Sequence, residues 1–225
     1  MSTELNSSAM TSNNRDLIVI GHGAAGLAAA LSAAEAAHAA SLSVNVMLLE
    51  KASEADAGGN TRWTPSYMRM ASVDRVEPSF VHDMLEATKF RGDESYFATL
   101  AAHAPATVQW IAAHGVPFHQ PVYYLAKGPP RIQPVGGGET IHRELSRAAR
   151  DAGIEFRFSC AAEALIADRG KISGVRLDGG ELLAAGAGGS RQRRFPGQQS
   201  DDARAFRRRR RCHSPARATR EFQFR

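Results

Sequence analysis

The sequence has few cysteines and no long hydrophobic run. Cys160 and Cys212 lie far apart, so they form neither a disulfide framework nor a Cys-x-x-Cys redox pair. No hydrophobic run approaches the roughly 20 residues that span a bilayer. The first 14 residues are polar and lack the hydrophobic segment of a signal peptide. These absences argue against a secreted disulfide scaffold and a membrane protein, and they lead us to expect a reduced, cytoplasmic protein.

An excess of positive charge is also missing from most of the chain. Residues 190–225 contain 12 arginines and three acidic residues, whereas the whole sequence has 28 basic and 23 acidic residues. The rest of the chain is therefore slightly acidic. We expect no nucleic-acid partner for it, since a nucleic-acid-binding surface is usually basic.

The N-terminal part has the order strand, glycine turn, helix, strand. The hydrophobic run Leu17–Ile20 is typical of a strand buried on both faces, and an alanine-rich stretch to about residue 40 favours a helix. Residues 44–49 form a second hydrophobic run that ends at Glu50. This order builds a parallel sheet and predicts an α/β fold of the Rossmann type.

The glycine turn matches the pattern Gly-x-Gly-x-x-Gly. Gly21 permits a tight turn, Gly23 lets the backbone approach a pyrophosphate, and Gly26 lets helix and strand pack closely. Glu50 lies 24 residues past Gly26, where a carboxylate can accept from ribose hydroxyls, and an acid there disfavours NADP. The turn and Glu50 together predict a dinucleotide site, but they leave both FAD and NAD open.

A second glycine pair follows Glu50 and favours FAD. Residues 58–61 read Gly-Gly-Asn-Thr, in a polar stretch with neither a strand nor a helix pattern. A plain NAD domain would continue directly into its next helix. Glycines allow a close approach to a cofactor, while Asn60 and Thr61 offer hydrogen-bonding groups. The alternative reading is an ordinary surface turn.

Helices and then short strands are predicted for the rest of the chain. Helical spacing occurs near residues 78–90, 94–103, 105–114 and 140–152, with glycines at 115 and 153 as C-terminal caps. A strand is predicted at 154–159, and the strands at 164–167, 172–177 and 181–184 are separated by glycine turns, which indicates a β-meander. We therefore divide the chain into a disordered lead (1–14), the N-terminal part of the FAD-binding domain (15–185) and a basic, disordered tail (186–225).

These motifs together resemble the fumarate reductase/succinate dehydrogenase flavoprotein family. The resemblance rests on the segments DLIVIGHGAAGLAAAL, VMLLEK and GGNT, and it covers about residues 15–185. GGNTRWT looks most like the tricarballylate dehydrogenase-type members. The resemblance implies an incomplete Rossmann-like FAD-binding domain with a parallel sheet and a β-meander, and a function as an FAD-dependent oxidoreductase.

The resemblance also implies which residues bind FAD. Glycine-turn residues would surround the diphosphate, Glu50 would bind the adenosine ribose, Asn60 and Thr61 would lie towards the flavin, and backbone near Ala164 would lie towards the adenine. Some members attach FAD covalently through a histidine before the glycine pair; residues 53–57 contain none here, so noncovalent FAD is expected. The complete set of cofactor-binding predictions is Gly21, Gly23, Ala25, Gly26, Glu50, Lys51, Gly59, Asn60, Thr61 and Ala164.

The sequence departs from the family after the meander, where members continue into a Gly-Gly-Phe segment and a catalytic cap domain. Residues 193–206 can be encoded by codons that, read one nucleotide later, give Gly-Gly-Phe-Pro-Gly and a family-like continuation. A frameshift near residues 184–193 is therefore inferred, and weak FAD binding without catalysis is expected of the chain as written. Without the strand that follows in the family, Leu17–Ile20 is expected to form an exposed hydrophobic edge of the sheet. A genuine basic tail that binds nucleic acid or an acidic partner is the rival interpretation.

The predicted parent function is hydride transfer at a carbon–carbon bond of a small di- or tricarboxylate-like substrate. No catalytic residue and no metal ligand is assigned. Arg62 and Arg69 are expected to form surface ion pairs rather than to bind a substrate carboxylate. For His22 a cofactor contact and a side chain that points away both remain open, and His142 is expected to be solvated or to cap a helix. The alternatives are a noncatalytic nucleotide-binding fragment, a basic binding module and an NAD-dependent dehydrogenase.

Overall fold

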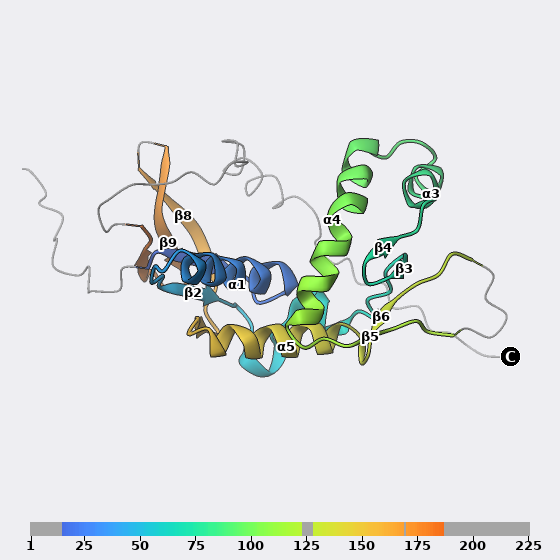
Figure 1. The fold of residues 1–225 in the computed structure, drawn as a ribbon. Coiled ribbons are helices and arrows are strands. Elements are labelled where there is room, and N and C mark those ends of the chain that lie inside the picture. The colour runs from blue at the N-terminus through green and yellow to red at the C-terminus, as the bar shows by residue number, and fades with distance from the viewer. Residues whose placement is uncertain (1–14, 123–127, 169, 187–225) are drawn as a thin grey trace, which may run out of the picture. The chain divides into compact units, whose positions relative to one another are not determined.

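The computed structural model describes residues 15–122, 128–168 and 170–186, and its glycine-turn motif belongs to a parallel sheet. Within these residues the strands follow the order β1 (Leu17–Ile20), β2 (Val46–Leu49) and β7 (Glu155–Arg157), and both pairings are parallel. Helix α1 (Ala24–Ala39) connects β1 to β2 (Figure 1). The predicted α/β class with a Rossmann-like parallel sheet is confirmed.

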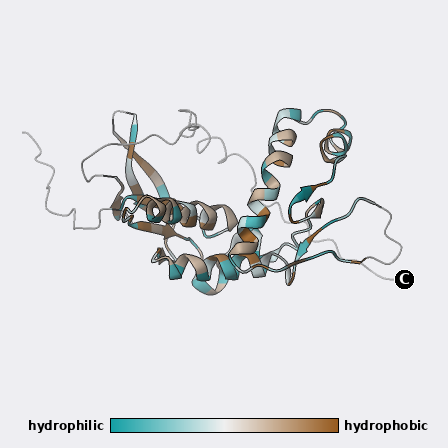
Figure 2. Ribbon diagram, viewed as in Figure 1, coloured by the Kyte–Doolittle hydropathy of each residue, from teal (hydrophilic) through white to brown (hydrophobic). Residues whose placement is uncertain are grey.

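Strand β2 is buried on both of its faces. Val46 and Leu48 belong to a core that includes Leu27 and Leu31 of α1 and Leu145 of α5 (Gly137–Asp151). The alternate residues Met47 and Leu49 pack on the other side, against residues of the β-meander. In Figure 2 the strand below α1 has mostly the colour of hydrophobic residues, whereas α5 has both hydrophobic and hydrophilic residues along its length. Successive side chains of a strand point to opposite faces, so β2 packs against helices on one face and against the β-meander on the other.

Strand β1 is not buried on both faces, as its hydrophobic run alone predicted, but has the exposed edge expected of the chain as written. Only Val19 is buried, and Ile20 is 45% exposed. Among the described residues β1 pairs only with β2, so its other edge has no neighbouring strand. A strand at the edge of a sheet keeps part of its side-chain surface exposed.

The predicted β-meander is confirmed. Strands β8 (Ala162–Asp168), β9 (Lys171–Leu177) and β10 (Leu182–Ala184) form an antiparallel sheet in the order β10-β9-β8. Val175, Leu177 and Leu183 of this sheet form the second core with Met47 and Leu49 of β2.

The helical middle of the chain contains one long helix where two were predicted. Helix α3 spans Phe80–Ala87, and α4 spans Glu94–Ala113 with Pro105 inside it. Phe97 lies before the proline and is buried, as are Val108 and Ile111 after it. We attribute the continuity to this packing, because it offsets the hydrogen bond that a proline removes. Gly115 follows with φ +96°, as expected of a helix C-terminal cap.

Short elements complete the described chain. They are η2 (Glu54–Asp56), α2 (Gly59–Trp63), β3 (Met70–Ser72), β4 (Arg75–Val76), β5 (Phe118–His119) and β6 (Gln133–Pro134). Helix α2 was not predicted, because its one turn is too short to show a helical pattern. Helix α5 begins at Gly137, three residues before the predicted start, and its N-terminal end packs directly against α2, where a Cβ on Gly138 would lie 1.9 Å from the Thr61 carbonyl oxygen.

Candidate cofactor site

The glycine turn joins β1 to α1 with no room for added side-chain atoms at its closest point. Gly21 has φ +103°, a conformation that side chains of other residues rarely adopt. A Cβ on Gly26 would lie 1.9 Å from the carbonyl oxygen of Gly21. The first and third glycines of the motif therefore do what the sequence pattern requires of them: one makes the turn and the other allows the helix to pack on it.

The N-terminus of α1 presents free backbone N–H groups. Gly23 is the N-cap residue and supplies no side-chain cap. The N–H of Ala24 donates to Thr61 Oγ1 at 3.0 Å. The N–H groups of Ala25 and Gly26 donate to no residue in the described part of the chain. Such groups, together with the positive end of the helix dipole, suit a diphosphate.

Glu50 is a buried carboxylate held by two backbone groups. It is 9% exposed; its Oε2 accepts from the N–H of His22 at 2.8 Å, and its Oε1 accepts from the N–H of Ala52 at 2.9 Å. Each oxygen retains a further lone pair, which can accept from a ribose hydroxyl. The backbone of Glu50 also accepts from the N–H of Cys160 at 2.8 Å, so the segment that leads into β8 runs beside it.

The second glycine pair lies against the glycine turn. Gly58 and Gly59 have φ values of +114° and +52°. A Cβ on Gly23 would lie 3.5 Å from Thr61 Oγ1 and 3.7 Å from the Gly58 carbonyl oxygen. Two motifs that are separated by more than 30 residues in the sequence therefore form one backbone-lined surface.

The predicted site residues fall into two groups. Gly21, Gly23, Gly26, Glu50 and Thr61 are linked by the contacts given above. The others lie around this group: Ala25 at the start of α1, Lys51, Gly59 and Asn60 exposed near Glu50 and Thr61 in sequence, and Ala164 half-buried on β8.

The structure adds a pair of histidines that sequence reasoning did not connect. The His22 side chain is 2% exposed, and its Nδ1 lies 3.0 Å from His142 Nε2 of α5. The expectation that His142 is solvated or caps a helix is wrong: it is half-buried against His22. The i, i+4 spacing of Gly138, His142 and Ser146 on an amphipathic helix was a usable signal, because it places two polar side chains on the face that packs inward.

Burial controls the ionisation of both histidines. Desolvation and the neighbouring His142 lower the pKa of His22 to about 4, against an opposite effect from Glu50. Desolvation and Arg62 likewise lower the pKa of His142, while Glu139 opposes the change. Both rings are therefore neutral at pH 7.

The described residues enclose several cavities, of which two differ in their linings. One of about 280 Å³ is lined by His22, His142 and Ser146, together with charged residues of α2, α5 and η2. The other, of about 430 Å³, lies among α3, α4 and β3, and hydrophobic side chains supply most of its walls. None of its lining residues belongs to the glycine turn or to residues 58–61.

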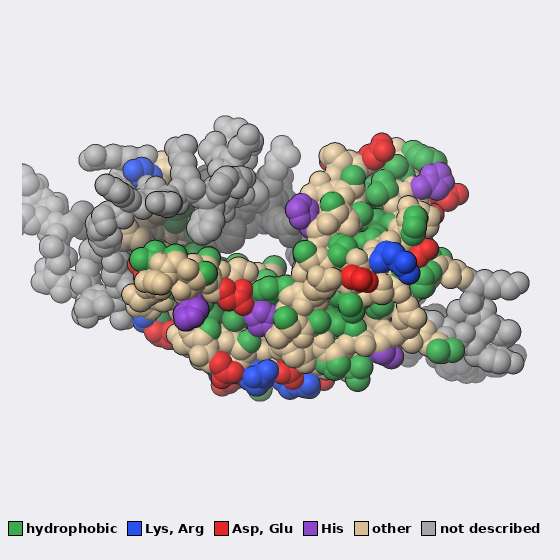
Figure 3. Space-filling view, viewed as in Figure 1, with side chains coloured by type: hydrophobic (Ala, Val, Ile, Leu, Met, Phe, Trp, Pro, Cys, Tyr) green, Lys and Arg blue, Asp and Glu red, His purple; other side chains and the backbone are tan. Residues whose placement is uncertain are grey.

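Arg62 and Arg69 form the ion pairs expected of them. Arg62 lies 3.7 Å from Glu139 and donates to the carbonyl of Ala55, and Arg69 pairs with Asp83. Charged side chains of both signs also gather along the outer edge of α5, where Arg143 and Arg147 pair with Glu144 (Figure 3).

Two further kinds of site were sought in the described residues. No group of three or more histidine, cysteine or acidic side chains there is arranged to hold a metal ion. No helix within the described ranges is long and hydrophobic enough to cross a membrane.

Comparison with protein families matches residues 16–200 to the model described as FAD binding domain. The curated vinyl phenol reductase of Lactiplantibacillus plantarum is 30% identical over 178 residues, which are 72% of this chain and 33% of that protein. A zeta-carotene-forming phytoene desaturase of Myxococcus xanthus is 41% identical over 54 residues, 24% of this chain and 10% of the desaturase. The chain thus spans about a third or less of these relatives.

Solved structures share the fold at lower identity. A 3-ketosteroid-Δ4-(5α)-dehydrogenase from Rhodococcus jostii RHA1 matches with a TM-score of 0.64 and 20% identity, over 82% of this chain and 47% of that one. A flavocytochrome c3 fumarate reductase matches with a TM-score of 0.61 and 23% identity, over 77% of this chain and 32% of that one. At these identities the likeness establishes the fold alone.

Proposed function

The chain belongs to the FAD binding domain family of FAD-dependent oxidoreductases, and we propose that residues 15–186 form the part of such an enzyme that holds the ADP portion of FAD. The observation that carries the proposal is the convergence of Glu50, Thr61 and the free N–H groups of α1 on one backbone-lined surface. FAD fits this surface because the diphosphate needs N–H donors and the ribose needs an acceptor.

Each group has a defined part in this proposal. The N–H groups of Ala25 and Gly26 donate to the diphosphate, and Glu50 accepts from the adenosine ribose. Thr61 holds the second glycine pair in place through its bond with the Ala24 N–H. Residues 53–57 contain no histidine for a covalent bond to the flavin, which supports noncovalent binding.

When bound, FAD supplies hydride transfer. We propose a carbon–carbon bond of a small di- or tricarboxylate-like substrate as the reacting group, on the resemblance of GGNTRWT to tricarballylate dehydrogenase-type members. Arg62 and Arg69 are engaged with Glu139 and Asp83, so the proposal assigns neither to the substrate. We assign no catalytic residue in residues 15–186, and the activity is proposed for a longer protein that contains this part.

We also retain the frameshift near residues 184–193 as a proposal. It is supported by the change in composition after the meander and by the family-like reading in the shifted frame. Resequencing the gene across the codons for residues 180–195 tests it: a missing or extra nucleotide supports the proposal, and an unchanged reading overturns it.

FAD binding by the purified chain tests the main proposal. We expect saturable quenching of FAD fluorescence and no binding of NADH. Glu50→Gln places an amide NH₂ against one of two backbone N–H donors, so we expect the dissociation constant for FAD to rise about tenfold. Glu86→Gln is the matched control, because Glu86 is exposed on α3. NADH binding without FAD binding, or equal effects of the two variants, would contradict the proposal.

A further inference from the structure

The buried side chain of His22 is the one group of the glycine turn that FAD binding, as proposed above, does not use. Its Nδ1 lies 3.0 Å from His142 Nε2, and its Nε2 lies 3.4 Å from Ser146 Oγ. Both partners belong to α5, whereas the backbone N–H of His22 donates to Glu50. One residue therefore connects the ribose acceptor, the glycine turn and α5.

Aromatic rings complete the surroundings of His22. The ring centroids of Phe156 and Phe158 lie 4.8 Å and 5.2 Å from that of His22, and both contacts are edge-on. Such a site favours a neutral imidazole, because these rings supply no hydrogen-bonding partner for a charged one. The polar contacts of the His22 side chain within the described chain are those to His142 and Ser146.

The bond between the two imidazoles requires one nitrogen to donate and the other to accept. It forms when both rings are neutral or when one is charged, and it is lost when both are protonated, because two N–H groups then face each other. Several charged groups also face the pair from the neighbouring elements. They are Glu50 after β2, Glu54 of η2, Arg62 of α2, and Glu139, Arg143 and Arg150 of α5.

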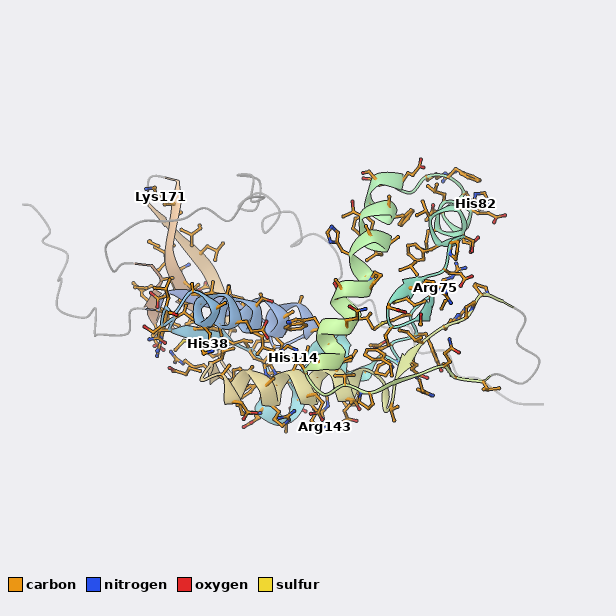
Figure 4. All side chains as sticks on the ribbon, viewed as in Figure 1. His38, Arg75, His82, His114, Arg143 and Lys171 are labelled. Atoms are coloured by element: carbon orange, nitrogen blue, oxygen red, sulfur yellow. The ribbon has the colours of Figure 1, made fainter. Side chains whose placement is uncertain are left out.

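These surrounding charges act in both directions: Glu50 and Glu139 favour the protonated rings, whereas Arg62 and Arg150 disfavour them. Arg150 pairs with Glu54, Arg62 lies near Glu139, and Arg143 pairs with Glu144 at the solvent-facing edge of α5 (Figure 4). Each nearby acid other than Glu50 thus already has an arginine partner. Burial therefore dominates, and the pair stays neutral at pH 7.

Helix α5 also contacts the second glycine pair. A Cβ on Gly58 would lie 3.0 Å from His142 Cδ2, and a Cβ on Gly138 would lie 1.9 Å from the Thr61 carbonyl oxygen. His142 therefore lies against both segments that hold FAD in the proposed function, the glycine turn at His22 and the second glycine pair at Gly58. A shift of α5 would displace both segments, since no free space separates them from the helix.

We propose that His22 and His142 are positioning residues: as a neutral hydrogen-bonded pair they lock the glycine turn onto α5, and acidification releases this lock. The effect on FAD rests on the function proposed above. The effect on the turn itself does not, and it can be measured in the chain without cofactor.

Hydrogen exchange of the segment 21–27 and the FAD dissociation constant test the proposal, each at pH 7.5 and at pH 4, where protonation of His22 becomes substantial. His142→Phe keeps the ring but removes its nitrogens, and His142→Gln keeps a hydrogen-bonding group that does not titrate. At pH 7.5 we expect His142→Phe to accelerate exchange of the turn and to weaken FAD binding, each about tenfold. We expect His142→Gln to stay within about twofold of the unmodified chain.

The change with pH provides the second readout. At pH 4, after correction for the intrinsic exchange rate, exchange of this segment should accelerate more in the unmodified chain than in His142→Gln, in which only His22 of the pair still titrates. His38→Gln is the control, because His38 is exposed at the end of α1 (Figure 4), and it should behave as the unmodified chain. Equal pH dependence of His142→Gln and the unmodified chain would overturn the proposal, even if His142→Phe failed to fold. If the unmodified chain bound no FAD, the function proposed above would fail, while the exchange data would still decide the role of the pair.

Discussion

Two regions of this molecule are packed in opposite ways. In the glycine-turn region, formed by β1, α1, β2 and α5, an added Cβ at Gly26 or Gly138 would lie 1.9 Å from a backbone oxygen. In the hairpin-helix region, formed by β3, β4, α3 and α4, a cavity of about 430 Å³ remains open between hydrophobic side chains. In the first region the backbones of distant segments touch, while in the second the cavity lies between hydrophobic side chains of α3, α4 and the paired strands β3 and β4.

The difference indicates where positional accuracy is needed. A site that binds a diphosphate through backbone N–H groups depends on the position of the backbone itself. Glycine and buried, hydrogen-bonded polar groups such as Glu50 and His22 provide that accuracy. A hydrophobic side-chain layer can tolerate empty space and still contribute burial.

The largest expected effect comes from breaking the tight region at its closest contact. Gly26→Ala would place a methyl group against the Gly21 carbonyl oxygen, and we expect a loss of about 3 kcal/mol or more of unfolding free energy, together with FAD binding. Urea unfolding and FAD titration measure both. Gly128→Ala is the control, since a Cβ there meets nothing within 4 Å; similar losses in the two variants would remove the basis of the comparison.

A somewhat smaller effect should follow from protonating the tight region. The pKa of His22 is lowered from 6.5 to about 4, so the folded chain favours the neutral ring and the unfolded chain binds the proton more readily. Its stabilisation is complete above pH 6.5 and is lost as the pH falls from 6.5 towards 4, on the order of 2–3 kcal/mol.

Urea unfolding across this range, with His22→Gln for comparison, isolates that contribution. The carboxylates with lowered pKa values, such as Glu144 and Asp93, lose their contribution only at lower pH, below their ordinary values of 4.5 and 3.8. A His22→Gln profile that matched the unmodified chain between pH 6.5 and 4 would show that His22 does not cause the loss.

The same substitution, alanine to leucine, is expected to change the unfolding free energy differently in the two regions. Ala30 of α1 is fully buried, so Ala30→Leu should cost about 1–3 kcal/mol of unfolding free energy. Ala104 of α4 lines the open cavity, so Ala104→Leu should change the unfolding free energy by less than about 1 kcal/mol. Urea midpoints provide the measurement, and equal costs would mean that the cavity is not available to an added side chain.

The smallest effect is expected at the ion pair of the hairpin-helix region. A hydrogen bond from Ser79 and then the Arg69 guanidinium lower the pKa of Asp83, but both partners of the pair are partly exposed. Arg69→Ala should therefore move the thermal midpoint by no more than about 2 °C, and less in 0.5 M salt. A larger shift in calorimetry would show that this region depends on a specific polar contact.

The sequence by itself determined the order of elements and the local chemistry of the turn. Hydrophobic runs, alanine-rich stretches and glycine turns act over a few residues, so they were sufficient to predict the parallel sheet, the meander and the glycine roles at residues 21 and 26. They failed at α4, where Phe97, Val108 and Ile111 hold the helix together across Pro105. At β1 the hydrophobic run alone predicted burial on both faces, and the exposed edge was expected only from the absence of the strand that follows in the family.

Only the tertiary structure decided which distant segments meet. Thr61 contacts the Ala24 N–H, Cys160 contacts Glu50, and His142 contacts His22 across 120 residues. No local pattern encodes these distances, because they arise when α5 and the segment before β8 pack against the same end of the sheet. The ionisation of His22 is a property of the same kind, since burial and neighbours set it after the chain has folded.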